Sequence, residues 1–338
     1  MTLSEFIHKM PKIELHVHLE GSIRPETLLL LAQRNNVPLP ASDVEGLRRW
    51  YTFRDFDHFI EIYMTFAKCL RSAEDIELIA REFFIGQAAH NILYSEVTYT
   101  PYSQYLANRI PFRDQLDALN RARAWAEREL HVFAGWVMDI SRNTEPEEGI
   151  TVADWATSAM TEGCVALGLG GPEVGHPPEK FTAAFEIAAK AGLPAVPHAG
   201  ETEGPNSIWG ALKSLNAVRI GHGVRCLEDP ALVEYLRVNR VPLEVCPTSN
   251  VCLKVIPDFK LHPLPRLLAE GLVVTLNSDD PPMFNTTLTN EYLKAADAFG
   301  FTKEDFVRFN RTALKVSLLP EKQKLELSER MEGEYQEL

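Results

Sequence analysis

The sequence predicts an α/β protein built as a single closed (β/α)₈ barrel. Eight short apolar runs rich in β-branched residues recur along the 338 residues, and amphipathic helical stretches separate them. Strands that alternate with helices form parallel sheets with right-handed crossovers. Eight such units fit a closed barrel better than an open doubly wound sheet, which usually has fewer strands and an early glycine-rich phosphate turn that this chain lacks.

The predicted strands, in chain order, span residues 13–19, 92–99, 132–140, 164–170, 194–200, 218–224, 242–248 and 273–279. Helical patterns between the later strands span residues 180–192, 228–240 and 262–271. The first and last of these helices end on glycine, as many helices do. We therefore expect one domain over residues 1–338, with an acidic helical tail at about 303–338.

The connection between the first two strands is unusually long, and we expect a helical insertion at about 24–90. Within it Phe56, Phe59, Tyr63 and Phe66 recur at intervals of three, four and three, which predicts one face of a helix. This aromatic face either packs on the barrel wall or covers the site as a lid with an apolar inner surface.

Charge and cysteine content narrow the class of protein. The chain has 34 basic and 47 acidic side chains, so its net charge is −13, which disfavours nucleic acids and anionic membranes as partners. No apolar run approaches the ~20 residues of a membrane span. Five cysteines without a CxxC pair argue against a disulfide framework or a thiolate zinc site. We expect a cytoplasmic protein that acts on small molecules; its oligomeric state stays open.

Chemically active side chains gather at the predicted carboxyl ends of the strands, where barrel enzymes place their sites. His16 and His18 lie two residues apart on the first strand and therefore share a face. An HxH pair alone is common by chance. The interpretation depends on further side chains at the ends of the fifth, sixth and eighth strands, namely His198, His222, Asp279 and Asp280.

Three imidazoles and one carboxylate are a ligand set that suits Zn²⁺ and leaves a position for an activated water. Glu201 follows His198 by three residues, on a turn, where a carboxyl group could shuttle protons if burial raised its pKa. The alternatives are buried structural histidines and a helix-capping or surface glutamate. The other histidines lie outside this pattern and are expected to be structural or exposed: His8, His58, His90, His131, His176 and His262.

The ordered motifs MPKIELHVHLEGS, HAGE, RIGHGV, CPTSN and NSDDP resemble the adenosine deaminase family over Pro11 to about Pro281. Members are zinc-dependent (β/α)₈ barrels of the amidohydrolase type. The resemblance implies that one zinc ion is bound by His16, His18, His198 and Asp279.

The same resemblance implies roles for four other residues. Glu201 would protonate the purine N1, and His222 would orient and deprotonate the attacking water. Asp280 would steady that water and accept a hydrogen bond on the N7 side of the purine. Gly171, in GLGG, would offer its backbone N–H to the ring, because a residue without Cβ allows close approach.

The sequence departs from the family pattern at two places, both among the residues expected to contact the substrate. Glu20 stands where adenosine-specific members commonly have Asp, and GGPE at 170–173 stands where they commonly have AGDE. HxHxEG is similar to branches that act on free adenine or on aminodeoxyfutalosine, whereas GPNSIWGAL resembles the nucleoside type. We expect hydrolytic deamination of adenosine, 2′-deoxyadenosine or aminodeoxyfutalosine to a 6-oxopurine and ammonia, with Glu20 facing the sugar end; free adenine is the alternative.

Other classes fit less well. A cytidine-deaminase-type enzyme needs HxE and PCxxC, which are absent. A metal-dependent phosphoesterase that opens with HxH needs more metal ligands, and a dinuclear amidohydrolase needs a carbamylated Lys at a strand end. A non-catalytic binding protein would be expected to lack a ligand or the acid, and this chain has the whole set.

Overall fold

The computed structural model describes residues 1–53 and 56–338, without the side chains of residues 56 and 57. Eight parallel strands form two four-stranded sheets, ordered β1-β2-β3-β4 and β5-β6-β7-β8. Their bounds are β1 Lys12–His18, β2 Ile92–Tyr99, β3 Phe133–Ser141, β4 Cys164–Gly170, β5 His198–Ala199, β6 Ile220–His222, β7 Pro242–Val245 and β8 Val273–Leu276.

Backbone hydrogen bonds join the two sheets at both edges. The N–H of His18 donates to the carbonyl of Asp279 at 2.8 Å, and the N–H of Asp279 donates to the carbonyl of His16 at 3.1 Å. On the other side, the N–H of Val196 donates to the carbonyl of Leu167 at 2.9 Å. All eight carboxyl ends are therefore brought to one face, which is the condition for the expected site.

Two strands, β2 and β4, have the predicted bounds, and β5 to β8 are shorter than predicted. The fifth predicted strand, 194–200, keeps only His198 and Ala199 as regular strand. Pro194 and Pro197 lack the N–H that a regular ladder uses, so this segment pairs through an isolated bridge at Ala195.

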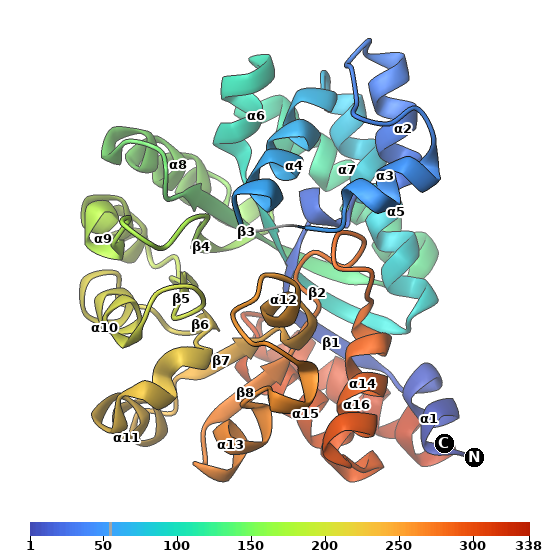
Figure 1. The fold of residues 1–338 in the computed structure, drawn as a ribbon, viewed down its shortest axis with the longest axis vertical. Coiled ribbons are helices and arrows are strands. Elements are labelled where there is room, and N and C mark those ends of the chain that lie inside the picture. The colour runs from blue at the N-terminus through green and yellow to red at the C-terminus, as the bar shows by residue number, and fades with distance from the viewer. Residues whose placement is uncertain (54–55) are drawn as a thin grey trace.

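Helices alternate with the strands and surround them (Figure 1). In the described part of the connection between β1 and β2 lie the four helices α2 to α5, and α15 and α16 form the C-terminal segment. The helices are α1 Leu3–Lys9, α2 Pro25–Arg34, α3 Val44–Trp50, α4 Phe56–Cys69, α5 Ala73–Ala89, α6 Pro101–Asn108, α7 Phe112–Leu130, α8 Pro146–Ser158, α9 Thr182–Ala191, α10 Pro205–Ser214, α11 Pro230–Val238, α12 Pro247–Cys252, α13 Leu264–Ala269, α14 Leu288–Phe299, α15 Lys303–Val316 and α16 Glu321–Glu337.

Short 3₁₀ turns complete several connections: η1 Glu20–Ser22, η2 Met160–Glu162, η3 Pro178–Phe181, η4 Val224–Glu228 and η5 Phe259–Leu261. Apolar side chains of the strands and helices pack into a few buried clusters, two of them large. Across the described residues, the helices are all too short or too polar to span a membrane.

Candidate active site

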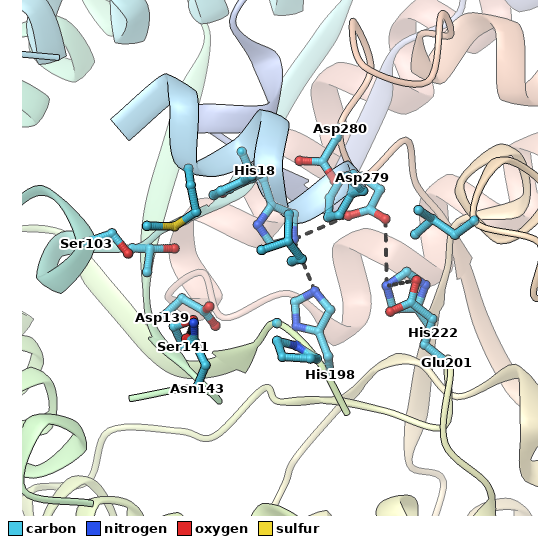
Figure 2. Close-up of a pocket in the computed structure, with 18 residues that line it drawn as sticks. His18, Ser103, Asp139, Ser141, Asn143, His198, Glu201, His222, Asp279 and Asp280 are labelled. Carbon is cyan, nitrogen blue, oxygen red and sulfur yellow. Dashed lines mark hydrogen bonds and ion pairs between the residues drawn. The ribbon is translucent and has the colours of Figure 1, made fainter. Parts of the chain in front are cut away.

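The four predicted metal ligands lie together at the carboxyl ends of the strands. Figure 2 labels His18, His198 and Asp279. His16 and His18 come from β1, His198 begins β5, and Asp279 follows β8; one ligand atom from each lies within 4.8 Å of the others. The Nε2 atoms of His18 and His198 are 3.1 Å apart, and Oδ1 of Asp279 is 3.3 Å from Nε2 of His18. All four side chains are buried.

The chemistry of this cluster fits a bound metal ion. Nε2 of His16 is buried and makes no hydrogen bond within the described residues, which is costly unless another group uses its lone pair. Three imidazole nitrogens and one carboxylate oxygen match the ligands and the low coordination number of zinc. We conclude that the chain contains a buried His₃Asp metal site.

The metal-facing orientation of His16 is set by Glu244, on β7. Oε2 of Glu244 lies 2.9 Å from Nδ1 of His16, which leaves Nε2 to face the cluster. Arg219 donates to Oε1 of Glu244 at 2.5 Å and also pairs with Glu96. Burial raises the pKa of the Glu244 carboxyl, but Arg219 and His16 together outweigh burial and hold that pKa below its ordinary value. A carboxylate behind a ligating histidine is typical of metal sites.

Glu201 and His222 lie beside the metal ligands. Nε2 of His222 is 3.8 Å from Oε1 of Glu201 and 3.7 Å from Oδ2 of Asp279. Burial, reinforced by the Asp279 carboxylate, raises the pKa of Glu201 well above its ordinary value and so favours the protonated carboxyl. Burial lowers the pKa of His222 to about 4, so its ring is neutral at pH 7.

A relay of hydrogen bonds fixes the ring of His222 from behind. The backbone N–H of Leu264 donates to Nδ1 of His262, whose Nε2–H therefore donates to Oδ1 of Asn250 at 3.1 Å. The Nδ2 group of Asn250 then donates to Nδ1 of His222 at 3.3 Å. In the neutral ring of His222, the proton is consequently on Nε2, the nitrogen directed at Glu201 and Asp279.

The turn that carries Glu201 is held by Glu173. The two oxygens of this buried carboxylate accept the backbone N–H groups of Gly200, Glu201, Thr202 and Glu203 at 2.7 to 2.9 Å. One side chain thus satisfies four consecutive donors. The HAGE turn gains its geometry from a residue of the loop after β4.

Backbone strain and missing Cβ atoms mark the same region. His222 and Asp279 adopt positive φ values of 60° and 66°, which are unusual for residues other than glycine and persist where the surroundings impose them. A Cβ on Gly21 would lie 1.6 Å from Oδ1 of Asp280, and one on Gly221 would lie 2.8 Å from Cε1 of His16. The glycines of HLEGS and RIGHG therefore make room for two site residues.

A cavity opens to solvent over these groups, with about 730 Å³ of empty space. Phe59 and Tyr63 of α4 line it together with Ile60 and Met64, whereas Phe66 packs in the hydrophobic core. The inner face of α4 thus supplies an apolar wall of the cavity, and Phe59 also packs in the core, as the packing interpretation expected. Closure of α4 as a lid stays a prediction. The remaining residue of the aromatic pattern is Phe56, whose side chain lies outside the described part of the chain.

The three predicted substrate-binding residues differ in position. Gly171 and Asp280 line the cavity. Gly171 has φ of +89°, which favours glycine, and Oδ1 of Asp280 makes no hydrogen bond within the described residues. Glu20 lies one layer back: it accepts the backbone N–H of Thr100 at 3.0 Å and the hydroxyl of Tyr63 at 3.3 Å. Glu20 therefore meets the cavity through Tyr63 and Thr100.

The family model described as adenosine deaminase matches residues 11–333. The chain belongs to the adenosine deaminase family. It is accordingly a metal-dependent purine deaminase, a hydrolase of the aminohydrolase type.

Curated relatives of this deaminase divide between two substrates. The chain is 40% identical over 319 residues to an aminodeoxyfutalosine deaminase of Streptomyces avermitilis, covering 94% of this chain and 89% of the relative. It is 36% identical over 325 residues to an adenine deaminase of Wolinella succinogenes, covering 96% of this chain and 98% of the relative.

Solved structures agree on the fold. An adenine deaminase from Arthrobacter aurescens superposes with a TM-score of 0.91 at 31% identity, covering 96% of this chain and 98% of that one. An amidohydrolase from Burkholderia ambifaria, solved with bound Zn, gives a TM-score of 0.91 at 25% identity, covering 99% of this chain and 94% of that one. The eight parallel strands of this deaminase therefore match known barrel structures.

Sequence reasoning missed several residues of this deaminase that support the site. His262 was expected to be structural, yet it begins the contacts that reach His222 through Asn250. Asn250 stands in the CPTSN motif, which was a usable signal. Glu173 stands in GGPE, where the sequence shows only a departure from AGDE. Glu244 carried no local signal, because its partner His16 is 228 residues away.

Proposed function

We propose that this deaminase hydrolyses the 6-amino group of an adenine nucleoside, releasing ammonia and a 6-oxopurine. The observation that carries the proposal is the joint exposure of His18, His198, Asp279 and the acid–base pair Glu201 and His222 to one cavity. A substrate held there meets a metal site and a proton donor together. We further infer one (β/α)₈ barrel domain over residues 1–338, with the helices after β1 as an insertion.

The metal in this proposal is one Zn²⁺ per chain, held by His16, His18, His198 and Asp279. When bound, zinc supplies a Lewis acid that lowers the pKa of a water molecule towards 7. Two observations support this choice: Nε2 of His16 makes no hydrogen bond within the described residues and lies 3.4 Å from Oδ1 of Asp279, and the Burkholderia ambifaria structure contains zinc.

Glu201 is the proposed general acid. Burial raises its pKa and so favours the protonated carboxyl, and its Oε1 makes no hydrogen bond within the described residues, so it is available to a ligand. Transfer of its proton to the purine N1 makes C6 more electrophilic and thereby favours attack by water.

His222 and Asp280 are the proposed partners of the attacking water. The relay through Asn250 favours an orienting role for His222, because Nε2–H can donate to that water. Removal of the water proton by His222, the other role implied by the family, requires Nε2 without hydrogen. Asp280 accepts a hydrogen bond from the water or from the N7 side of the purine, and Gly171 donates its backbone N–H to the ring.

The nucleoside is favoured over the free base by two observations. Identity is 40% to the aminodeoxyfutalosine deaminase, against 36% and 38% to two adenine deaminases over similar lengths. The segment after HAGE, GPNSIWGAL, also resembles the nucleoside type. Free adenine is the second candidate because the structure of an adenine deaminase superposes closely.

A substrate panel tests the proposal. Ammonia release is measured with adenosine, 2′-deoxyadenosine, aminodeoxyfutalosine, 5′-methylthioadenosine and adenine. We expect a higher kcat/KM for at least one nucleoside than for adenine. A highest kcat/KM with adenine would transfer the assignment to the second candidate, and no ammonia from any compound would contradict the proposed reaction.

A further inference from the structure

One side of the cavity is lined by polar groups that the proposed chemistry does not use. Asp139 and Ser141 end β3, and Asn143 follows two residues later, so every second residue faces the same cavity. Asp139 is buried, Ser141 is half-buried and Asn143 is exposed. With Ser103 of α6 these residues form what we call the β3 wall, which runs from the floor of the cavity to its mouth.

The carboxyl group of Asp139 is the unusual member of this wall. Only 3% of the residue is exposed, and within the described residues Oδ1 has no hydrogen-bond partner. The nearby cation, Arg142, is engaged elsewhere: its guanidinium donates to the carbonyls of His176 and His198. A buried acceptor without a partner is costly, which indicates that a ligand supplies the missing donor.

The neighbouring strand is built around this carboxyl group. A Cβ on Gly168 would lie 2.6 Å from Oδ1 of Asp139, and a Cβ on Gly170 would lie 2.7 Å from Oδ2. Glycine at both positions of β4 therefore leaves space for the carboxyl. Within the described residues, Asp139 is outside both groups of side chains close enough to share a metal ion.

The β3 wall lies across the cavity from the acid–base residues. Figure 2 shows Asp139, Ser141 and Asn143 on one side and Glu201 and His222 on the other, with His198 between them. In a purine, C6, N1 and N7 lie along one edge, and the N9 substituent leaves from the opposite edge. A purine that presents C6 to the metal site and N1 to Glu201 therefore directs its N9 substituent away from Glu201, towards the β3 wall.

We propose that Asp139 is a specificity-determining residue that accepts a hydrogen bond from a sugar hydroxyl at N9 and thereby selects a nucleoside over free adenine. This inference rests on the proposed function and extends it to the sugar. A carboxyl oxygen that carries no proton accepts hydrogen bonds, so the ligand group that satisfies Oδ1 of Asp139 is a donor. A free base could offer a single N9–H, whereas Ser103, Ser141 and Asn143 extend the polar surface over several further contacts.

The test uses the zinc-loaded enzyme and Asp139→Asn, which preserves shape and removes the charge. We expect kcat/KM for adenosine to fall by about 10- to 100-fold, mainly through KM, and kcat/KM for adenine to change by less than about threefold. In the unmodified enzyme, kcat/KM for either 2′-deoxyadenosine or 3′-deoxyadenosine should be lower than that for adenosine by a similar factor, because the hydroxyl that contacts Asp139 is missing. For that same analogue, Asp139→Asn should lower kcat/KM only slightly further.

Equal losses for adenosine and adenine would overturn the proposal, since Asp139 would then act on the base or on the fold. The proposal would also be overturned if, for every deoxy analogue, Asp139→Asn lowered kcat/KM by the same factor as it does for adenosine. Ser103→Ala serves as the matched control and should change kcat/KM for adenosine less than Asp139→Asn does. If no compound is deaminated, the proposed function fails, and calorimetry with inosine and hypoxanthine decides separately whether Asp139→Asn weakens nucleoside binding.

Discussion

Glu173 holds the backbone of Glu201: Oε2 of Glu173 accepts the N–H of Glu201 at 2.9 Å. The same oxygen accepts the N–H groups of Thr202 and Glu203, and Oε1 accepts that of Gly200. The proposed acid is thus positioned by a carboxylate 28 residues earlier in the chain. Loss of the acceptor should displace the acid more than the metal ligands.

We expect Glu173→Gln to lower kcat by about 10-fold or more. The amide replaces one acceptor oxygen with an N–H donor, which faces the backbone N–H groups and repels them. Hydrogen bonds to charged groups contribute about 1.5–3 kcal/mol each, so their loss is substantial. Zinc content should stay near that of the unmodified enzyme. Glu186→Gln, on the exposed side of α9, is the control. Unchanged turnover in Glu173→Gln would show that the turn keeps its geometry without the carboxylate.

Glu201→Gln should retain zinc and fold yet lose turnover by about 10²- to 10⁴-fold, as expected for a positioned acid. His222→Ala should behave similarly. The buried carboxyl of Glu201 has a raised pKa and donates only while protonated, so kcat should fall as pH rises through that pKa. This alkaline limb should be absent from the residual activity of Glu201→Gln. Near-normal activity of the variant would mean that another residue supplies the proton.

Metal analysis should find about one zinc ion per chain at full activity, and chelators should abolish turnover. Glu244→Gln should weaken zinc binding by about 10- to 100-fold, because Nδ1 of His16 then loses the carboxylate that orients its ring. Competition with a chromophoric chelator measures this affinity without turnover. Two stoichiometric metals at full activity would require a dinuclear mechanism.

Glu20→Asp should raise kcat/KM for adenosine relative to 5′-substituted adenine nucleosides, with little change in zinc content. The shorter side chain cannot keep both contacts, to the N–H of Thr100 and the hydroxyl of Tyr63, so Tyr63 should shift within the cavity. The two kcat/KM values are measured on one enzyme preparation. An unchanged ratio would show that Glu20 does not influence the sugar end.

The strands of the two sheets and the metal ligands could be predicted from the sequence, because each is indicated by a short local pattern. A period-2 strand pattern placed His16 and His18 on one face, and the ends of later strands placed His198 and Asp279 at the same rim. Parallel strands bring their carboxyl ends together whatever their separation along the chain. The site could therefore be assembled without knowledge of the loops.

The supporting contacts could not be predicted, since each depends on an approach between distant segments. In the sequence, Asp139 has no feature that distinguishes it from other strand residues. Its role becomes visible only in the fold, where Gly168 and Gly170 lie against its carboxyl group. Glu20 follows the period of β1 in the sequence, but η1 begins at Glu20 and turns its carboxylate towards Thr100. The strand period ends where the 3₁₀ turn begins, so the contacts of Glu20 follow from the turn and not from the alternation of β1.

A competition assay tests substrate selection most directly. The zinc-loaded enzyme receives adenosine, aminodeoxyfutalosine and adenine at equal concentration in one mixture, and chromatography follows each substrate and its 6-oxo product. The initial consumption rates then stand in the ratio of the kcat/KM values. We predict that at least one nucleoside is deaminated well before adenine is consumed. Preferential conversion of adenine to hypoxanthine would contradict the assignment of this protein as a nucleoside deaminase.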